Sequence, residues 1–342
     1  MLAAVVENPG KLIIKDIPEP TITDYQALVK IEACCICNST DTKLIEGVTP
    51  WSVGEWTPWS AQYPGILGHE SVGTVIETGS KVRNFKIGDR VLRVMAKAAG
   101  YASIFGGFCE TGVITDKKAA REDKAETDPE LFHPGQQIVP KSMDPVSATQ
   151  LITLKETLSF LHRMKLKSGM SLLIMGTGPV GLSFTYLARE AIGANPIIIL
   201  GRRDEALRRA QIFGAHFTAN NSTGRVLELV KKYCPKGVRL VIDAVGDIDL
   251  MRLGLEAAGE EGRLAVYGIG EKNEEFEQIM NDKRILQVYP EESEVHEEVL
   301  ALVRENRIDP SRFVTHVLPL KEISKGFELI KNKQAIKVVI KM

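Results

Sequence analysis

The sequence predicts a two-domain α/β protein, with one β-barrel-like domain and one doubly wound domain built on a parallel sheet. The chain has 342 residues, of which 44% are hydrophobic, so it exceeds the size at which a single core keeps growing. Its first third is broken into short runs rich in β-branched residues. From about Val146 onward, strand-like and helix-like segments alternate, as a parallel sheet with crossover helices requires.

The strands expected in the first third are separated by proline and glycine, which mark tight reversals of the chain. Their apolar and β-branched runs are Leu12 to Ile17, Ala27 to Ala33, Gly73 to Thr78 and Arg90 to Val94. This pattern is typical of an all-β, barrel-like region.

The second region opens with leucines at near-helical spacing between Leu151 and Leu166, followed by a buried-strand pattern from Ser171 to Met175. Strands and helices then alternate, and one more amphipathic helix is expected from Val295 to Glu305. The segments between are Ile197 to Leu200, Glu205 to Phe213, Gly224 to Lys232, Leu240 to Asp243 and Leu264 to Tyr267.

Charge and cysteine content exclude several classes of protein. The net charge of -1, from 43 basic and 44 acidic residues, offers no field for a nucleic acid or an anionic membrane. No apolar run is long enough to span a bilayer and no secretory leader is recognisable, so we expect a cytoplasmic protein. The five cysteines do not form a disulfide framework, and Cys34 and Cys35 are expected to be buried thiols.

A glycine fingerprint follows the strand that ends at Met175. In Gly176-Thr-Gly178-Pro179-Val180-Gly181, the first glycine permits the tight turn and the second lets the backbone approach a pyrophosphate. Gly181 allows close packing of helix on strand, and the helix N-terminus stabilises phosphate charge. This context favours dinucleotide binding over a merely structural turn.

The end of the next strand predicts which dinucleotide binds. An NAD enzyme usually places an acidic residue there to bind the ribose hydroxyls, but this chain has Gly201 followed by Arg202 and Arg203. A guanidinium grips a 2′-phosphate through charge-assisted bonds, so NADP(H) is favoured over NAD(H). The alternative is that both arginines are simply solvated and Asp204 caps the next helix.

A second group of residues supplies metal ligands from the β-rich region. Cys37-Asn-Ser39-Thr40-Asp41 and Gly68-His69-Glu70 together offer a thiolate, an imidazole and a carboxylate, which are the ligands that zinc prefers. A catalytic zinc ion keeps three protein ligands and one open position for a substrate oxygen.

With these motifs the sequence resembles the zinc-containing medium-chain dehydrogenase superfamily, the alcohol dehydrogenases, over nearly its whole length. Further matching stretches are Gly65 to Val75, Gly88-Asp-Arg-Val, Val241 to Gly246 and Thr315 to Leu320. The resemblance implies a GroES-like catalytic domain, residues 1–145 and 290–342, and a Rossmann domain, residues 146–289. It also implies a homodimer or homotetramer.

The resemblance assigns roles to individual residues. Cys37 and His69 would bind one catalytic zinc, Glu70 would be a ligand or a neighbour of one, and Ser39 would take the proton of the alcohol. The function implied is hydride transfer between a secondary alcohol, possibly a polyol, sugar or cyclitol, and NADP(H). The alternatives are a zinc-free quinone or enone reductase and a catalytically silent dinucleotide-binding protein.

Two departures from the family pattern concern the proton path. One extra residue separates Cys37 from Asp41, which leaves the roles of Thr40 and Asp41 open although Ser39 keeps its offset. The relay histidine, five residues after the cysteine, is replaced by Thr42, so a water or a ribose hydroxyl would take its place.

Two further departures concern metal ligands. The acidic or thiol ligand that many members carry ahead of the fingerprint falls near Ile152, which cannot bind metal. Glu156, one helical turn later, is the candidate replacement, so either it or Glu70 would complete the site. Between residues 93 and 116 the only cysteine is Cys109, so a four-thiolate structural zinc site is impossible there.

The segment from Gly47 to Pro64 looks long for the family and carries Trp51, Trp56 and Trp59. These indoles would line a pocket for a sugar, a cyclitol or a hydrophobic alcohol, or would anchor the loop by packing.

Overall fold

The computed structural model describes residues 1–48, 62–270 and 273–342, so the tryptophan-bearing segment lies outside the described residues. The chain forms two compact units. The first comprises Met1–Ile152 and Pro310–Met342, and the second comprises Thr153–Asp309. The sequence placed the boundaries earlier, at 145/146 and 289/290.

The later second boundary has a local cause. The Glu294 carboxylate accepts hydrogen bonds from Ser159 (2.6 Å) and Arg163 (2.9 Å), both on helix α4 (Gln150–Arg163). These contacts tie the segment that leads into α10 (His296–Arg304) to the second unit. The chain therefore returns to the first unit only at Pro310.

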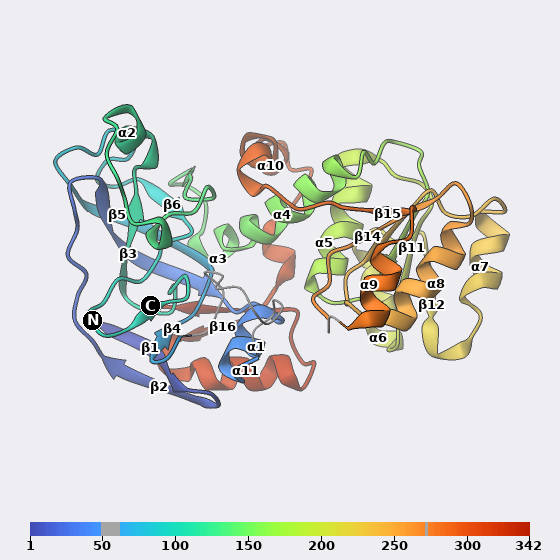
Figure 1. The fold of residues 1–342 in the computed structure, drawn as a ribbon, viewed down its shortest axis with the longest axis horizontal. Coiled ribbons are helices and arrows are strands. Elements are labelled where there is room, and N and C mark those ends of the chain that lie inside the picture. Colours follow the sequence, from blue (N-terminus) through green and yellow to red (C-terminus); the bar gives the residue numbers. More distant parts are fainter. Residues whose placement is uncertain (49–61, 271–272) are drawn as a thin grey trace. The chain divides into compact units, whose positions relative to one another are not determined.

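The first unit is built from two sheets, and the C-terminal strands belong to one of them. Figure 1 shows the red C-terminal segment lying beside the blue N-terminal strands. One sheet has the order β2 (Lys11–Asp16), β1 (Leu2–Asn8), β4 (Gly65–Ile66), β7 (Ala102–Ser103). The other has the order β16 (Val314–Pro319), β17 (Lys337–Lys341), β3 (Gln26–Cys35), β5 (Glu70–Thr78), β6 (Arg90–Leu92), β9 (Ile138–Val139), with β8 (Thr111–Thr115) also paired to β3.

Apolar side chains at alternate positions of these strands fill the core of the first unit. In β3, Ala27, Val29 and Ile31 are fully buried, because every second side chain points to the same face of the sheet. Short helices join or cover the strands. They are α1 (Thr40–Ile45), α2 (Lys117–Glu122), α3 (Pro145–Ala148) and α11 (Ile323–Lys331).

The second unit contains one parallel sheet whose strand order reverses beside its first strand. The order is β12 (Phe217–Asn220), β11 (Ile197–Gly201), β10 (Leu172–Met175), β13 (Leu240–Asp243), β14 (Arg263–Val266), β15 (Ile285–Leu286). The chain thus moves outward from β10 to β12 and then crosses to β13. Such a switch point, at the carboxyl ends of the strands, is where doubly wound sheets bind their ligands.

The apolar strands of this sheet are buried on both faces, as parallel strands covered by helices must be. Leu173, Met175, Ile198 and Leu200 pack into one cluster with residues of the helices Val226–Tyr233 (α7) and Ile248–Ala258 (α8). The helices after α4 are α5 (Pro179–Leu187), α6 (Asp204–Ile212), α7 (Val226–Tyr233), α8 (Ile248–Ala258), α9 (Glu274–Met280) and α10. Among all the described residues, no helix is long and apolar enough to cross a membrane.

Candidate functional site

Three predicted ligand residues come together in the first unit. One donor atom each from Cys37, His69 and Glu70 lie within 4.8 Å of one another. His69 and Glu70 lie next to each other where β5 begins, and Cys37 follows the end of β3. Because Cys35 of β3 pairs with Glu70 of β5, the sheet itself brings the two sequence motifs together.

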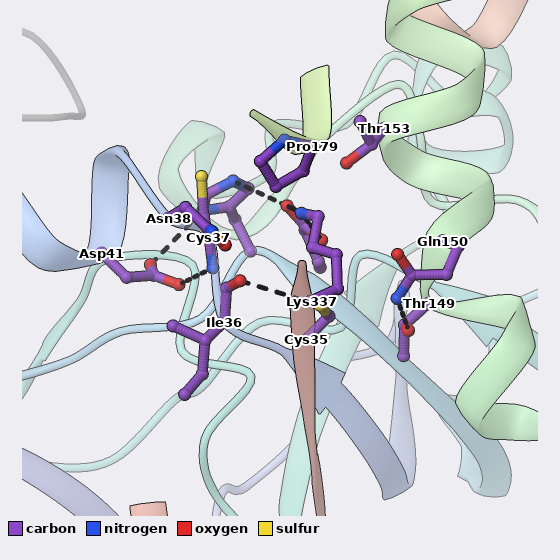
Figure 2. Close-up of polar contacts among 12 residues, drawn as sticks. Cys35, Ile36, Cys37, Asn38, Asp41, Thr149, Gln150, Thr153, Pro179 and Lys337 are labelled. Atoms are coloured by element: carbon purple, nitrogen blue, oxygen red, sulfur yellow. Dashed lines mark hydrogen bonds and ion pairs between the residues drawn. The ribbon is translucent and has the colours of Figure 1, made fainter. Parts of the chain in front are cut away.

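Asp41 orients two members of this group. Its Oδ2 accepts a hydrogen bond from the backbone N–H of Cys37 at 2.8 Å, and its Oδ1 lies 3.5 Å from Nδ1 of His69. Oδ1 is buried and has no hydrogen-bond partner of normal geometry within the described ranges. A carboxylate only accepts, so it favours a proton on Nδ1, and Nε2 would then be the nitrogen that binds a metal. Figure 2 shows the Asp41 carboxylate directed toward the backbone at Cys37.

Glu70 has a cationic partner from the end of the chain. Both of its carboxylate oxygens accept hydrogen bonds from Nζ of Lys337 on β17, at 2.5 and 2.6 Å. Each side chain is only 3% exposed. Burial opposes ionisation, but the Lys337 ammonium lowers the pKa of Glu70 below its ordinary value, and Glu70 in turn raises the pKa of Lys337.

The cysteines differ in their readiness to ionise. Burial raises the pKa of Cys34 and Cys35 well above the ordinary value, and both are fully buried, which confirms the prediction of buried thiols. Burial also opposes ionisation of Cys37, but the facing His69 outweighs it, so the net effect lowers the pKa of Cys37. Only a thiolate is a good metal ligand, so Cys37 is the suitable thiol of the three. The sulfur, nitrogen and oxygen donors therefore fit zinc.

A separate site lies in the second unit, after β10. Gly176 has a φ of +111°, which L-residues with a side chain rarely adopt, and it starts the turn into α5. A Cβ at Gly178 would meet nothing within 4 Å, whereas one at Gly181 would lie 1.9 Å from the carbonyl oxygen of Gly176. The turn is thus open to a ligand at Gly178 and closely packed at Gly181. Pro179 opens the helix, whose N-terminal amides face this turn.

The carboxyl end of β11 lies beside this glycine turn. A Cβ at Gly201 would come within 2.6 Å of the Thr177 side chain, so the fingerprint turn packs against the end of β11. Arg202 and Arg203 follow and are exposed, and Asp204 begins α6.

Comparison with known proteins identifies the family. Two family descriptors match the chain, "Alcohol dehydrogenase GroES-like domain" over residues 23–123 and "Zinc-binding dehydrogenase" over residues 179–305. NADP-dependent isopropanol dehydrogenase of Thermoanaerobacter brockii is 30% identical over 92% of this chain and 92% of its own length. The chain belongs to the zinc-dependent medium-chain alcohol dehydrogenase superfamily.

Two further relatives of this dehydrogenase cover it almost completely. L-threonine 3-dehydrogenase of Bacillus velezensis is 28% identical over 99% of the chain and 98% of its own length. The solved structure of alcohol dehydrogenase TADH from Thermus sp. ATN1 matches with a TM-score of 0.79 and 25% identity, covering 100% of this chain and 99% of that one. The predicted fold class, a GroES-like domain with a Rossmann domain, is confirmed, as is the prediction of an oxidoreductase that acts on CH–OH groups.

The remaining predicted site residues of the dehydrogenase lie in different surroundings. Ser39 is exposed and immediately precedes α1, and its side chain makes no capping hydrogen bond. Glu156 belongs to the second unit, where its carboxylate accepts a hydrogen bond from the hydroxyl of Tyr267 at 3.0 Å. The ligand group found among the described residues does not include Glu156, and its role as a metal ligand stays a prediction.

Three residues that lie beside Cys37, His69 and Glu70 were assigned no role in the sequence analysis. No motif marks Lys337 or Arg93, and the spacing from Cys37 leaves the role of Asp41 open. The buried Arg93 donates a hydrogen bond from its guanidinium to the backbone carbonyl of His69 at 3.0 Å. For Asp41 a signal existed in its closeness to Cys37 along the chain, whereas Glu70 and Lys337 are 267 positions apart and no local pattern links them.

Proposed function

We propose that this chain is an NADP(H)-linked dehydrogenase of small secondary alcohols that binds one zinc ion through Cys37 and His69, with Glu70 beside the ion. The observation that carries the proposal is the meeting of thiol, imidazole and carboxylate within 4.8 Å. When bound, zinc would polarise the hydroxyl of the substrate and the nicotinamide would exchange the hydride. The protein residues would position these groups and move the proton.

Ser39 is the proposed acceptor of the alcohol proton. Its exposed hydroxyl follows Cys37 by two residues and offers a route to solvent. Thr42, which stands at the family's relay position, donates its hydroxyl to the Asn38 carbonyl at 3.4 Å. That local bond supports the idea that water or the cofactor ribose, rather than Thr42, would carry the proton onward.

The preference for NADP(H) rests on the arginines after β11. A strand end that reads Gly201-Arg202-Arg203 has no carboxylate to repel a 2′-phosphate, and two exposed guanidinium groups can pair with it. The isopropanol dehydrogenase relative is named as NADP-dependent. Isopropanol is a secondary alcohol, and the other relative is named for position 3 of L-threonine, so secondary hydroxyls are the favoured substrate class.

A single zinc ion is proposed because the segment that carries Cys109 offers one thiol. Cys109 is buried and donates to the carbonyls of Gly106 and Thr111, and burial raises its pKa to about 12. The homodimer or homotetramer that the resemblance implies is part of the same proposal, and light scattering of the purified chain tests it.

The test uses the full-length chain purified with its metal. Zinc per chain is measured by mass spectrometry, and turnover is measured with NADP and NAD over simple secondary alcohols, L-threonine, polyols and cyclitols. Cys37→Ala should lose both zinc and turnover while keeping its circular dichroism spectrum. The control, Cys234→Ala at the end of α7, should keep both. Retained zinc and activity in Cys37→Ala would refute the site.

The outcomes also separate the rival functions. Reduction of quinones or enones without bound zinc would favour a zinc-free reductase, and bound zinc without turnover would favour a silent dinucleotide-binding protein. Within an active enzyme, Ser39→Ala should lower kcat by at least about 100-fold with zinc content unchanged. If Thr40→Val rather than Ser39→Ala has this effect, the extra residue has shifted the proton acceptor by one position.

A further inference from the structure

The Glu70–Lys337 ion pair occupies an unusual place, inside the candidate metal group. Oε1 of Glu70 lies 2.5 Å from Nζ of Lys337 and 4.0 Å from Nε2 of His69. Oε2 lies 2.6 Å from the same ammonium nitrogen. Both oxygens of the carboxylate therefore accept hydrogen bonds from Lys337 in the absence of a metal ion.

Strand pairing holds the two side chains in place. Cys35 of β3 pairs with Glu70 of β5 on one side and with Val339 of β17 on the other. Lys337 lies two residues before Val339, so its side chain points to the same face of the sheet as that of Val339. The pair thus joins two strands that flank β3, and removing one side chain leaves the charge of the other buried and unpaired unless another ion takes its place.

The charges around the group show what the lysine does. Cys37, Glu70 and Asp41 supply three acidic groups, while Lys337, His69 and the more distant Arg93 supply positive charge. A buried carboxylate needs a cationic partner, and the partners that Glu70 can contact include the ammonium of Lys337 and a metal ion held by Cys37 and His69. At the position where relatives carry a further ligand, the fully buried Ile152 offers none.

We propose that Lys337 competes with the metal ion for Glu70, so that Glu70 is a displaceable neighbour and Cys37 and His69 are the firm ligands of the first unit. Lys337 is then a positioning residue that holds the carboxylate away from the metal and leaves room for a substrate oxygen. This inference rests on the proposed zinc site. Its physical consequence is that removing the ammonium frees the Glu70 carboxylate to pair with the metal, so zinc is held more tightly.

The experiment measures the rate at which zinc leaves the loaded, full-length protein in excess chelator, followed with a metal-sensitive dye. Lys337→Met should release zinc at least about tenfold more slowly than wild type. Lys337→Arg keeps the positive charge and should release zinc at nearly the wild-type rate. Lys341→Met, an exposed position on the same strand, is the matched control. Unchanged or faster release from folded Lys337→Met overturns the proposal.

A second variant gives an answer even if Lys337→Met does not fold. Glu70→Gln removes the carboxylate charge but keeps a hydrogen-bond acceptor for Lys337. If Glu70 is a displaceable neighbour, Glu70→Gln should release zinc within about threefold of the wild-type rate. Release at least about 100-fold faster would show that Glu70 is a firm ligand and would overturn the proposal.

The double variant Lys337→Met/Glu70→Gln completes the cycle. It should release zinc at nearly the rate of Glu70→Gln alone, because the lysine acts only through the carboxylate. If the double variant still releases zinc slowly, Lys337 does not compete with zinc for Glu70. If wild type itself binds no zinc, the proposed function fails; if wild type binds zinc through Cys37 and Lys337→Met leaves release unchanged, only this inference fails.

Discussion

The Asp41 carboxylate lies 3.5 Å from Nδ1 of His69 while its second oxygen holds the backbone amide of Cys37. One side chain therefore sets the orientation of both proposed firm ligands. Asp41 makes both contacts from the first turn of α1, although one extra residue separates it from Cys37.

Asp41→Asn should weaken zinc binding about 10–100-fold, since the amide no longer stabilises a proton on Nδ1 of His69. Competition with a chelator of known affinity measures the effect. Asp16→Asn, a change at a surface carboxylate 90% exposed, should bind zinc like wild type. Equal zinc affinity in Asp41→Asn and wild type would show that His69 is oriented by other contacts.

Replacing Arg202 and Arg203 together by alanine should raise the KM for NADP at least about tenfold, because a charge-assisted bond to phosphate contributes about 1.5–3 kcal/mol. The KM for NAD should change little. Arg209→Ala, in the helix that follows these arginines and paired with Glu205, serves as the control for loss of surface charge. If the ratio of the KM for NADP to the KM for NAD stays at the wild-type value, the two arginines do not bind the 2′-phosphate.

Gly178→Ala and Gly181→Ala should separate cofactor binding from folding. The methyl group at 178 enters open space, so the melting temperature should stay near wild type while NADPH affinity falls at least about tenfold. At 181 the methyl group would overlap the Gly176 carbonyl, so stability should fall by about 2 kcal/mol or more. Thermal unfolding and NADPH fluorescence titration measure both quantities. Similar behaviour of the two variants would contradict the geometry.

The buried Asp243 should make the free energy of unfolding of the second unit depend on pH. Burial raises the pKa of this carboxyl to about 7, although the amides of Val245 and Gly246 oppose the shift. The unfolded group titrates near 3.9, so the native state holds the extra proton between about pH 4 and 7. Its stabilising contribution is complete below about pH 4 and is lost as the pH rises through 7.

The measurement is urea unfolding of wild type and Asp243→Asn between pH 4.5 and 8. The free energy of unfolding of wild type relative to the variant should fall as the pH rises, by roughly 1.4 kcal/mol for each step of one in pH, and should level off above pH 7. A difference between the two proteins that does not vary with pH would show that Asp243 is ionised throughout.

Much of the fold could be read from local patterns. The run that ends at Met175 and the alternation after it identified the parallel sheet, because a buried strand and its glycine turn are contiguous in sequence. The domain boundaries were harder to predict from the sequence. The segment around Glu294 carries no local sign that its carboxylate binds Ser159 and Arg163, and those contacts decide which unit contains it.

The chemical groups proposed for the site could be recognised from the amino-acid sequence alone: a thiol and an imidazole for a metal, glycines and arginines for a dinucleotide. Tertiary structure decided how these groups are partnered, bringing Glu70 and Lys337 together and turning Asp41 toward His69. Periodicity and spacing report on neighbours along the chain. The metal group instead depends on the pairing of β3 with β5 and β17, and such long-range register leaves no local trace in the residues themselves.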